Sequence, residues 1–426
     1  MADVDTASSA PDGVWQLLVD AHCHPTDDPR PWGSVEILAS KLDQVKIGQI
    51  CAMSTSTRDQ GFVAELAERL GTQKLRPAFG YHPWFTHTIS LTDGRDKAKH
   101  YEGLFFQQEE GQSSSLSLDP KRDTARKELD QLLPHLPDPV PLDELLAELR
   151  KNLSQHPTAL LGEVGLDRAF RLPTDPKGWT REPNEEEKDG EADMSDEERE
   201  RTHALGRRSR PLTSLTPDIG HQAEILKAQI RIAIEMGRSV SLHSVRAGGA
   251  TVEVLEALSK LFPSHGTGGR RGGLSRQQWK RQQKDAQRGA VDHGNVDGHI
   301  QGPSFDDINI DLHSCTLSPT MIRQLQQKHP NVYVSFSTAI NSRQKNLEEQ
   351  LRACDPKRLL TESDWHSAEG LAARTFDMVK LMTDVLGSAL LGENILDKDA
   401  DHRYERAAVV LHENWKRFVN DEVGHE

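Results

Sequence analysis

Two histidines stand two positions apart near the start of the chain, in the segment Asp20-Ala21-His22-Cys23-His24. Alternate side chains of a β-strand point to the same face, so Asp20, His22 and His24 would share a face and the two imidazoles would converge. Neutral imidazoles are common ligands of divalent metals. Because histidines also cap strands or bond to the backbone, this pair indicates a metal site only if further ligands accompany it.

Four further candidate ligands lie at or near the ends of short apolar runs, namely Glu163, His243, His313 and Asp364. Seen alone, Glu163 also fits an ordinary surface residue in a tight turn, and a single histidine at a strand end is more often structural than a ligand. The order of all six candidate residues along the chain indicates a metal site more specifically than any one of them does. Glu163 lies near its middle and could bridge two ions about 3.5 to 4 Å apart, as two-metal hydrolytic sites require. The two groups would be His22, His24 and Asp364 for one ion, and His243 and His313 for the other.

Eight short apolar runs resemble buried strands and would carry these residues. They span residues 16–21, 47–54, 75–80, 159–163, 239–243, 308–313, 332–336 and 358–362. Segments with helical spacing follow most of them, at residues 35–44, 60–70, 142–155, 219–236, 252–261, 319–328, 344–354 and 369–386. Gly162 and Gly165 would let neighbouring backbone approach Glu163 closely. This alternation predicts a (β/α)₈ barrel, in which active sites form at the carboxyl ends of the strands.

The chain of 426 residues is longer than the roughly 250 residues of a typical barrel. We expect a flexible N-terminus at 1–15, one barrel at 16–390 and a helical extension at 391–426. A final helix at 404–419 would cover the bottom or the outside of the barrel. Three polar stretches would interrupt the barrel, at 93–139, 172–217 and 263–303. Their composition cannot offset a chain entropy of about 1 to 2 kcal/mol per residue, so we predict loops or disorder there.

Two of these stretches carry concentrated charge. The acidic run at 182–200 is predicted to be a solvated loop, with a short helix or an interaction site as the alternative. Residues 270–288 hold basic side chains around Trp279. A disordered basic linker is favoured over a phosphate-contacting arm, because only one aromatic residue accompanies the charge. Both charged stretches offer a surface for a protein partner.

Composition limits the function further. The formal net charge of −14 argues against nucleic-acid binding through a broad basic surface, although metal ions could supply positive charge instead. The four cysteines lie far apart, and the start of the chain lacks a basic region followed by an apolar run. These features favour a reducing intracellular location, in the cytoplasm, the nucleus or both. No apolar stretch approaches the roughly 18 to 20 residues of a membrane span, so no membrane partner is expected.

The motifs resemble those of the TatD family of metal-dependent deoxyribonucleases, within the amidohydrolase-type barrel superfamily. The matching segments are 19–24, 80–83, 162–167, 242–243, 312–314 and 362–364, and the long insertions resemble a fungal-type branch. The resemblance implies a phosphodiesterase with DNA as its substrate and two divalent ions per chain, Mg²⁺ or Zn²⁺, with Mn²⁺ as a further option. It also implies that His82 lies near the substrate phosphate.

Three departures from the family pattern fall among the residues that would face the substrate. The family usually has a proline two residues after the Asp of its Glu-Thr-Asp segment, where this chain has Trp365 and His366. Around the sixth-strand histidine the family usually has a Phe or a Ser-Gly pair, where this chain has Cys315, Thr316 and Leu317. Arg246 follows the fifth-strand histidine by three positions rather than two. The three departures leave the candidate metal ligands unchanged. We expect Arg246 and His82 to bind the substrate.

We therefore interpret the chain as a hydrolase in which a metal-activated water attacks a phosphodiester. The catalytic candidates are Glu163, His82 and Asp364, the last as a ligand and proton acceptor, and Asp20 would support the histidines from outside the coordination sphere. One alternative keeps this centre but hydrolyses another ester or an amide, because a barrel does not fix the substrate. The other is a non-catalytic scaffold whose insertions bind proteins, against which the complete ligand set argues. The sequence leaves the oligomeric state open.

Overall fold

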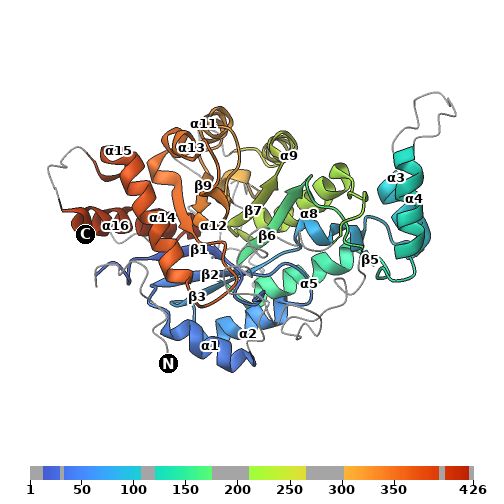
Figure 1. Ribbon diagram of the computed structural model, residues 1–426, viewed down its shortest axis with the longest axis horizontal. Helices are drawn as coiled ribbons and strands as arrows, with labels where there is room; N and C mark the ends of the chain where they lie inside the picture. The colour runs from blue at the N-terminus through green and yellow to red at the C-terminus, as the bar shows by residue number, and fades with distance from the viewer. Residues whose placement is uncertain are drawn as a thin grey trace, which may run out of the picture.

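Eight parallel strands form a nearly closed barrel in the computed structural model, which describes residues 13–28, 33–106, 120–174, 211–264, 302–392 and 399–421. Around the sheet the strands are β1 (Val19–Cys23), β2 (Gln49–Met53), β3 (Leu75–Phe79), β6 (Leu160–Asp167), β7 (Val240–Val245), β8 (Ile310–Leu312), β9 (Val332–Ser337) and β10 (Leu359–Glu362). The first and last strands meet, because Asp364 N donates to His22 O at 3.0 Å and His24 N donates to Trp365 O at 2.8 Å. Helices lie around the strands (Figure 1). The predicted (β/α)₈ barrel is confirmed.

Helices follow the strands as the spacing of apolar residues indicated. They are α1 (Val35–Gln44), α2 (Gln60–Leu70), α5 (Leu142–Gln155), α8 (Ile219–Met236), α9 (Gly248–Leu261), α11 (Pro319–Lys328), the short α12 (Thr338–Asn341), α13 (Leu347–Ala353), α14 (Leu371–Leu386) and α15 (Ser388–Leu391). Ser34, Asp218 and Ser318 cap the first turns of α1, α8 and α11 through their side chains. Gly237 follows the last residue of α8, and its left-handed φ of 63° suits glycine. Within the described ranges, no helix has the length and apolar character needed to cross a membrane.

A final helix, α16 (Ala400–Val419), covers the amino-terminal end of the barrel. Its Trp415 and Phe418 are 2% and 1% exposed and pack in one cluster with Val19, Tyr333 and Leu360. These three residues lie at or next to the first positions of their strands. Packing at this end of a barrel serves stability, because the active site forms at the other end.

Truncating Trp415 should therefore destabilise the fold without touching the opposite end. We expect Trp415→Ala to lower the free energy of unfolding by about 3 to 5 kcal/mol, the usual cost of removing a buried aromatic side chain. Val409, 43% exposed on the same helix, provides the control, and Val409→Ala should change stability by less than about 0.5 kcal/mol. Denaturant unfolding followed by circular dichroism measures both. Equal effects of the two substitutions would show that α16 does not close the barrel.

Two helices occupy much of the stretch 93–139, where the sequence predicted loops or disorder. They are α3 (Lys97–Phe106) and α4 (Pro120–Leu132), which stand side by side at the edge of the molecule (Figure 1). Tyr101 and Leu104 of α3 and Leu129 and Leu132 of α4 are buried together against Phe170. A short parallel pair, β4 (Ile89–Ser90) and β5 (Val140–Pro141), links the segment before α3 to the segment after α4. The prediction failed here because a small apolar cluster shared with the segment after β6 offsets the entropy of ordering.

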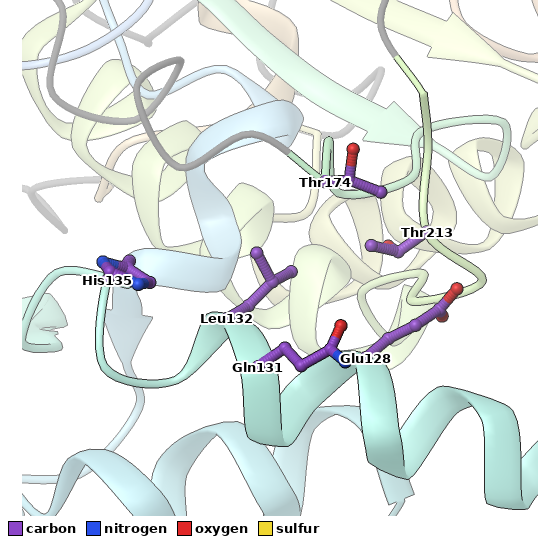
Figure 2. A pocket seen from close by; sticks show the side chains of 6 residues that line it. All are labelled: Glu128, Gln131, Leu132, His135, Thr174 and Thr213. Carbon is purple, nitrogen blue, oxygen red and sulfur yellow. The ribbon is translucent and has the colours of Figure 1, made fainter.

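A cavity of about 200 Å³ opens beside α4 (Figure 2). Its lining residues are Glu128, Gln131, Leu132, His135, Thr174 and Thr213. The segments that carry the two threonines are joined by an antiparallel bridge between Pro173 and Leu212. None of the predicted site residues lines this cavity. The charged runs at 182–200 and 270–288 lie outside the described residues.

Candidate metal centre

The six predicted ligands lie at the carboxyl-terminal half of the barrel and meet around Glu163. His22 belongs to β1 and His24 follows it, Glu163 and His243 lie within β6 and β7, His313 follows β8, and Asp364 stands two residues after β10. Gly165 allows β6 and β7 to approach closely, because a Cβ at this position would lie only 2.1 Å from His243 O. The sequence therefore brings these side chains together through the barrel topology and through a glycine in β6.

One group of polar atoms surrounds Oε2 of Glu163. Nε2 of His24 lies 3.2 Å from this oxygen, and Nε2 of His22 lies 3.6 Å from it. The two imidazole nitrogens are 3.0 Å apart. Asp364 Oδ1 completes the group at 3.7 Å from His22 Nε2 and 3.6 Å from His24 Nε2. The side chain of Asp364 is 16% exposed, so this group is open to solvent on that side.

A second group surrounds Oε1 of Glu163. His243 Nδ1 and His313 Nε2 each lie 2.7 Å from this oxygen and 3.2 Å from each other. The side chain of Glu163 is 3% exposed and that of His313 is 4% exposed. The two carboxylate oxygens of Glu163 thus face separate sets of imidazoles, which is the arrangement expected of a bridging ligand.

The distances between these atoms fit coordination of divalent cations. Ligands about 2.0 to 2.2 Å from a tetrahedral metal lie roughly 3.3 Å from one another, close to the separations of the two groups. Burial alone would lower the pKa of His24, but the hydrogen bond and charge of Glu163 and the charges of Asp27 and Asp364 raise it to about 9. Burial would raise the pKa of Glu163, yet His82, His313 and His22 hold it well below its usual range. The cluster therefore attracts positive charge, which either protons or metal ions can provide.

The outward-facing nitrogens of the imidazoles meet oxygen atoms. His22 Nδ1 lies 2.7 Å from Ser241 Oγ, and His243 Nε2 lies 3.6 Å from Asp167 Oδ2. Asp167 is itself fixed, because Trp84 Nε1 donates to its Oδ2 at 2.6 Å. Burial would raise the pKa of Asp167, but the nearby imidazole of His243 and the hydrogen bond from Trp84 lower it. Such partners behind a metal-bound imidazole orient the ring and leave the inner nitrogen free to coordinate.

His82 also lies against Glu163, but its hydrogen-bond pattern sets it apart from the ligands. Its Nδ1 accepts a hydrogen bond from Trp84 N at 3.1 Å, so in the neutral imidazole the hydrogen must be on Nε2. Nε2 lies 3.2 Å from Glu163 Oε1. Burial lowers the pKa of His82 to about 4, which favours the neutral form. His82 is therefore arranged to donate a hydrogen bond rather than to coordinate a metal through Nε2.

Two other predicted site residues stand outside the cluster. Asp20 is fully buried, and its Oδ1 accepts hydrogen bonds from the backbone N–H of His22 at 3.1 Å and of Ser363 at 3.0 Å. It therefore fixes the backbone where β1 meets β10 rather than an imidazole, and burial raises its pKa to about 7. Arg246 is exposed just beyond β7, with a φ of 50°. The contacts of the described residues do not join Arg246 to the cluster.

Sequence reasoning gave no role to Asp167 or Glu362, both of which contact the cluster. Asp167 follows Glu163 by four positions on β6, so strand alternation would have placed the two on one face. Glu362 precedes Asp364 by two positions, and the same rule would have applied at the end of β10. The alternation of side chains along a strand could therefore have identified both residues from the sequence.

Comparison with known proteins identifies the same family as the sequence motifs. The family model described as TatD related DNase matches residues 19–385, a range that contains all six predicted ligands. The chain is 29% identical over 381 residues to the Cut9-interacting protein scn1 of Schizosaccharomyces pombe, covering 87% of this chain and 92% of that protein. It is 26% identical over 234 residues to a Saccharomyces cerevisiae protein named as an uncharacterized deoxyribonuclease, covering 54% and 58% of the two chains.

Among solved structures, the TatD homolog YJJV from Escherichia coli K12 matches with a TM-score of 0.49 and 15% identity, covering 96% of this chain and all of that one. A TatD family hydrolase from Entamoeba histolytica matches with a TM-score of 0.48 and 10% identity, over 94% and 97% of the two chains. The two sequence relatives are both fungal, in agreement with the predicted branch. Because the family model spans most of its length, this chain belongs to the TatD related DNase family.

Proposed function

We propose that this chain is a divalent-metal-dependent hydrolase that cleaves the phosphodiester bonds of DNA with two ions per chain. The position of Glu163 supports this most strongly, since its Oε2 faces His22 and His24 while its Oε1 faces a separate set of imidazoles. Bound Mg²⁺, Zn²⁺ or Mn²⁺ would generate a nucleophile from water at neutral pH and offset the charge of a phosphate. The second effect matters for a chain whose formal net charge is −14.

The chain's own residues would orient the substrate and move protons. Asp364 is the most exposed of the carboxylates in the cluster, so it can accept a proton from the attacking water while its Oδ1 still faces His22 and His24. His82 would donate its Nε2 hydrogen to a phosphate oxygen beside Glu163. Arg246, exposed at the end of β7, would contact a phosphate farther from the reacting bond.

A protein-binding role is the second candidate. The relative scn1 is named as a Cut9-interacting protein, and its similarity extends over 87% of this chain. The charged stretches at 182–200 and 270–288 offer a further surface for such a partner. This role is compatible with catalysis, because the partner surface and the metal centre would use different residues.

Metal analysis followed by hydrolysis assays tests the proposed activity. We expect about two divalent ions per chain, DNA cleavage that is lost after chelation, and recovery when Mg²⁺, Mn²⁺ or Zn²⁺ is restored. Carboxylic ester and amide substrates in the same assay test the alternative substrates. The proposed deoxyribonuclease activity would be rejected if metal-loaded protein cleaved an ester or amide but left DNA intact with all three ions.

The pH dependence should move with the metal concentration. The raised pKa of His24, about 9, means that a proton must leave before an ion binds, so metal affinity falls as the pH drops below that value. At limiting metal we expect activity to decline from about pH 9 downward, whereas saturating metal should delay the decline to below about pH 6. Rates measured from acid to alkaline pH at both metal concentrations give the two midpoints. A midpoint that does not respond to metal would contradict competition between protons and ions.

A further inference from the structure

Glu362 is a fully buried carboxylate at the end of β10 that none of the proposed steps uses. Its Oε1 accepts hydrogen bonds from the backbone N–H of Ser314 and from Ser335 Oγ, the latter at 3.1 Å. The carboxylate therefore links β10 to β9 and to the segment that follows β8. Burying a charged group this completely is costly unless its partners compensate, and these two bonds occupy only one of its oxygens.

The other oxygen of Glu362 faces His313. Oε2 lies 3.7 Å from Nδ1 of His313, and neither atom has a hydrogen-bond partner among the described residues. This separation is about 0.5 Å longer than a hydrogen bond, so a small movement of the ring would close it. Nε2 of the same ring lies 2.7 Å from Glu163 Oε1. Glu362 and Glu163 thus stand on opposite sides of one imidazole.

The plane of the His313 ring is already fixed by stacking. The ring of His22 lies parallel to it, with an interplanar angle of 6° and a centroid separation of 3.8 Å. Stacking restricts the tilt of an imidazole, but it does not determine which nitrogen carries the hydrogen. A carboxylate determines this, because it accepts a hydrogen bond only from a protonated nitrogen, but His313 has one on each side: Glu163 beside Nε2 and Glu362 beside Nδ1. An ion bound at Nε2 would exclude hydrogen from that nitrogen and leave Nδ1, which faces Glu362, to carry it.

We propose that Glu362 is a positioning residue that holds the hydrogen of His313 on Nδ1 in the metal-loaded protein, so that Nε2 would offer its lone pair to an ion that Glu163 and His243 would also hold. This inference rests on the metal centre of the proposed function. Asp27 has a comparable place, 3.7 Å from Nδ1 of His24, but its side chain is 42% exposed and water can replace it. Water has no such access to the fully buried Glu362.

Substitution of Glu362 tests this role through metal binding rather than through catalysis. Glu362→Gln preserves the size of the side chain and removes its charge, and Glu349→Gln, at an exposed position of α13, is the matched control. We expect Glu362→Gln to bind one of two Zn²⁺ ions about 10- to 100-fold more weakly, as is typical when the partner of a metal-bound imidazole is lost. The other ion and the control should be unaffected. Competition with a chromophoric chelator measures both affinities, and two unchanged affinities in folded Glu362→Gln protein would overturn the proposal.

The tautomer of His313 gives a second readout that needs no variant of Glu362. Long-range proton–nitrogen NMR of the Zn²⁺-loaded wild-type protein shows which ring nitrogen carries the hydrogen. We expect it on Nδ1, and a hydrogen on Nε2 would overturn the proposal even if Glu362→Gln does not fold. Neither readout involves DNA. Protein that binds two Zn²⁺ ions without cleaving DNA would therefore reject the proposed substrate alone, whereas protein that binds no Zn²⁺ would reject both proposals.

Discussion

The Glu163→Gln variant is expected to lose DNA hydrolysis by about 1,000-fold or more, which corresponds to about 4 kcal/mol of activation free energy. In the native site both oxygens of Glu163 face imidazoles, one set through Oε2 and the other through Oε1. Gln has one oxygen and one NH₂ group, so one set of imidazoles would face hydrogen atoms, and both sets would lose an anionic partner. We therefore expect at least one ion to be lost together with the activity.

Three measurements separate this outcome from a general loss of structure. Metal content after gel filtration counts the ions, circular dichroism follows the fold, and the rate of DNA cleavage is measured with excess Mg²⁺, Mn²⁺ or Zn²⁺. Glu349→Gln removes an exposed charge and should retain both ions and the rate. If folded Glu163→Gln protein kept two ions and its wild-type rate, Glu163 would not be the bridge.

The fold and the inner ligands could be predicted because both follow from local patterns. Short apolar runs that alternate with helical spacing have few arrangements other than a parallel barrel, and the carboxyl ends of its strands converge. A histidine or carboxylate at such an end, such as His243 or Asp364, must then lie near the others. Neither step requires knowledge of side-chain conformations.

The roles of neighbouring residues depended on distances that the sequence does not contain. Asp167 matters because its Oδ2 lies 3.6 Å from His243 Nε2 and receives a hydrogen bond from Trp84 Nε1. The assignment of His82 as a donor depends on a single backbone N–H in the turn after β3. Arg246 is the opposite case, because its place in the sequence suggested a substrate contact, while in the structure it is exposed just beyond β7 and has a left-handed φ of 50°.

The helices outside the barrel show a related limit. Tyr101 and Leu104 have helical spacing, but the residues that bury them belong to α4 and to the segment after β6. A polar stretch of this kind has too little apolar surface to predict a stable structure by itself. Likewise, the spacing of Trp415 and Phe418 indicates one apolar face of a helix, while only the structure shows that this face covers the amino-terminal end of the barrel.

The Asp364→Asn variant is expected to keep the fold and most of its metal affinity while the rate of DNA cleavage falls by about 100- to 10,000-fold, the usual contribution of a proton acceptor. Asp364 has a φ of 50°, a left-handed conformation that Asn adopts as readily as Asp, so the backbone should not be strained. Asn also retains an oxygen that can face His22 and His24. It cannot accept a proton at neutral pH, so the chemical step should be affected more than substrate binding.

Single-turnover rates and DNA affinity, measured separately on metal-loaded protein, distinguish these effects. We expect a large fall in the single-turnover rate with DNA affinity within a few fold of the wild type, since only the transition state requires the proton acceptor. Asp384→Asn, at an exposed position of α14, is the matched control and should match the wild type in both measurements. If Asp364→Asn kept the wild-type single-turnover rate, another group would have to take the proton. A weakened affinity for metal with an unchanged rate at saturating metal would leave Asp364 as a ligand only.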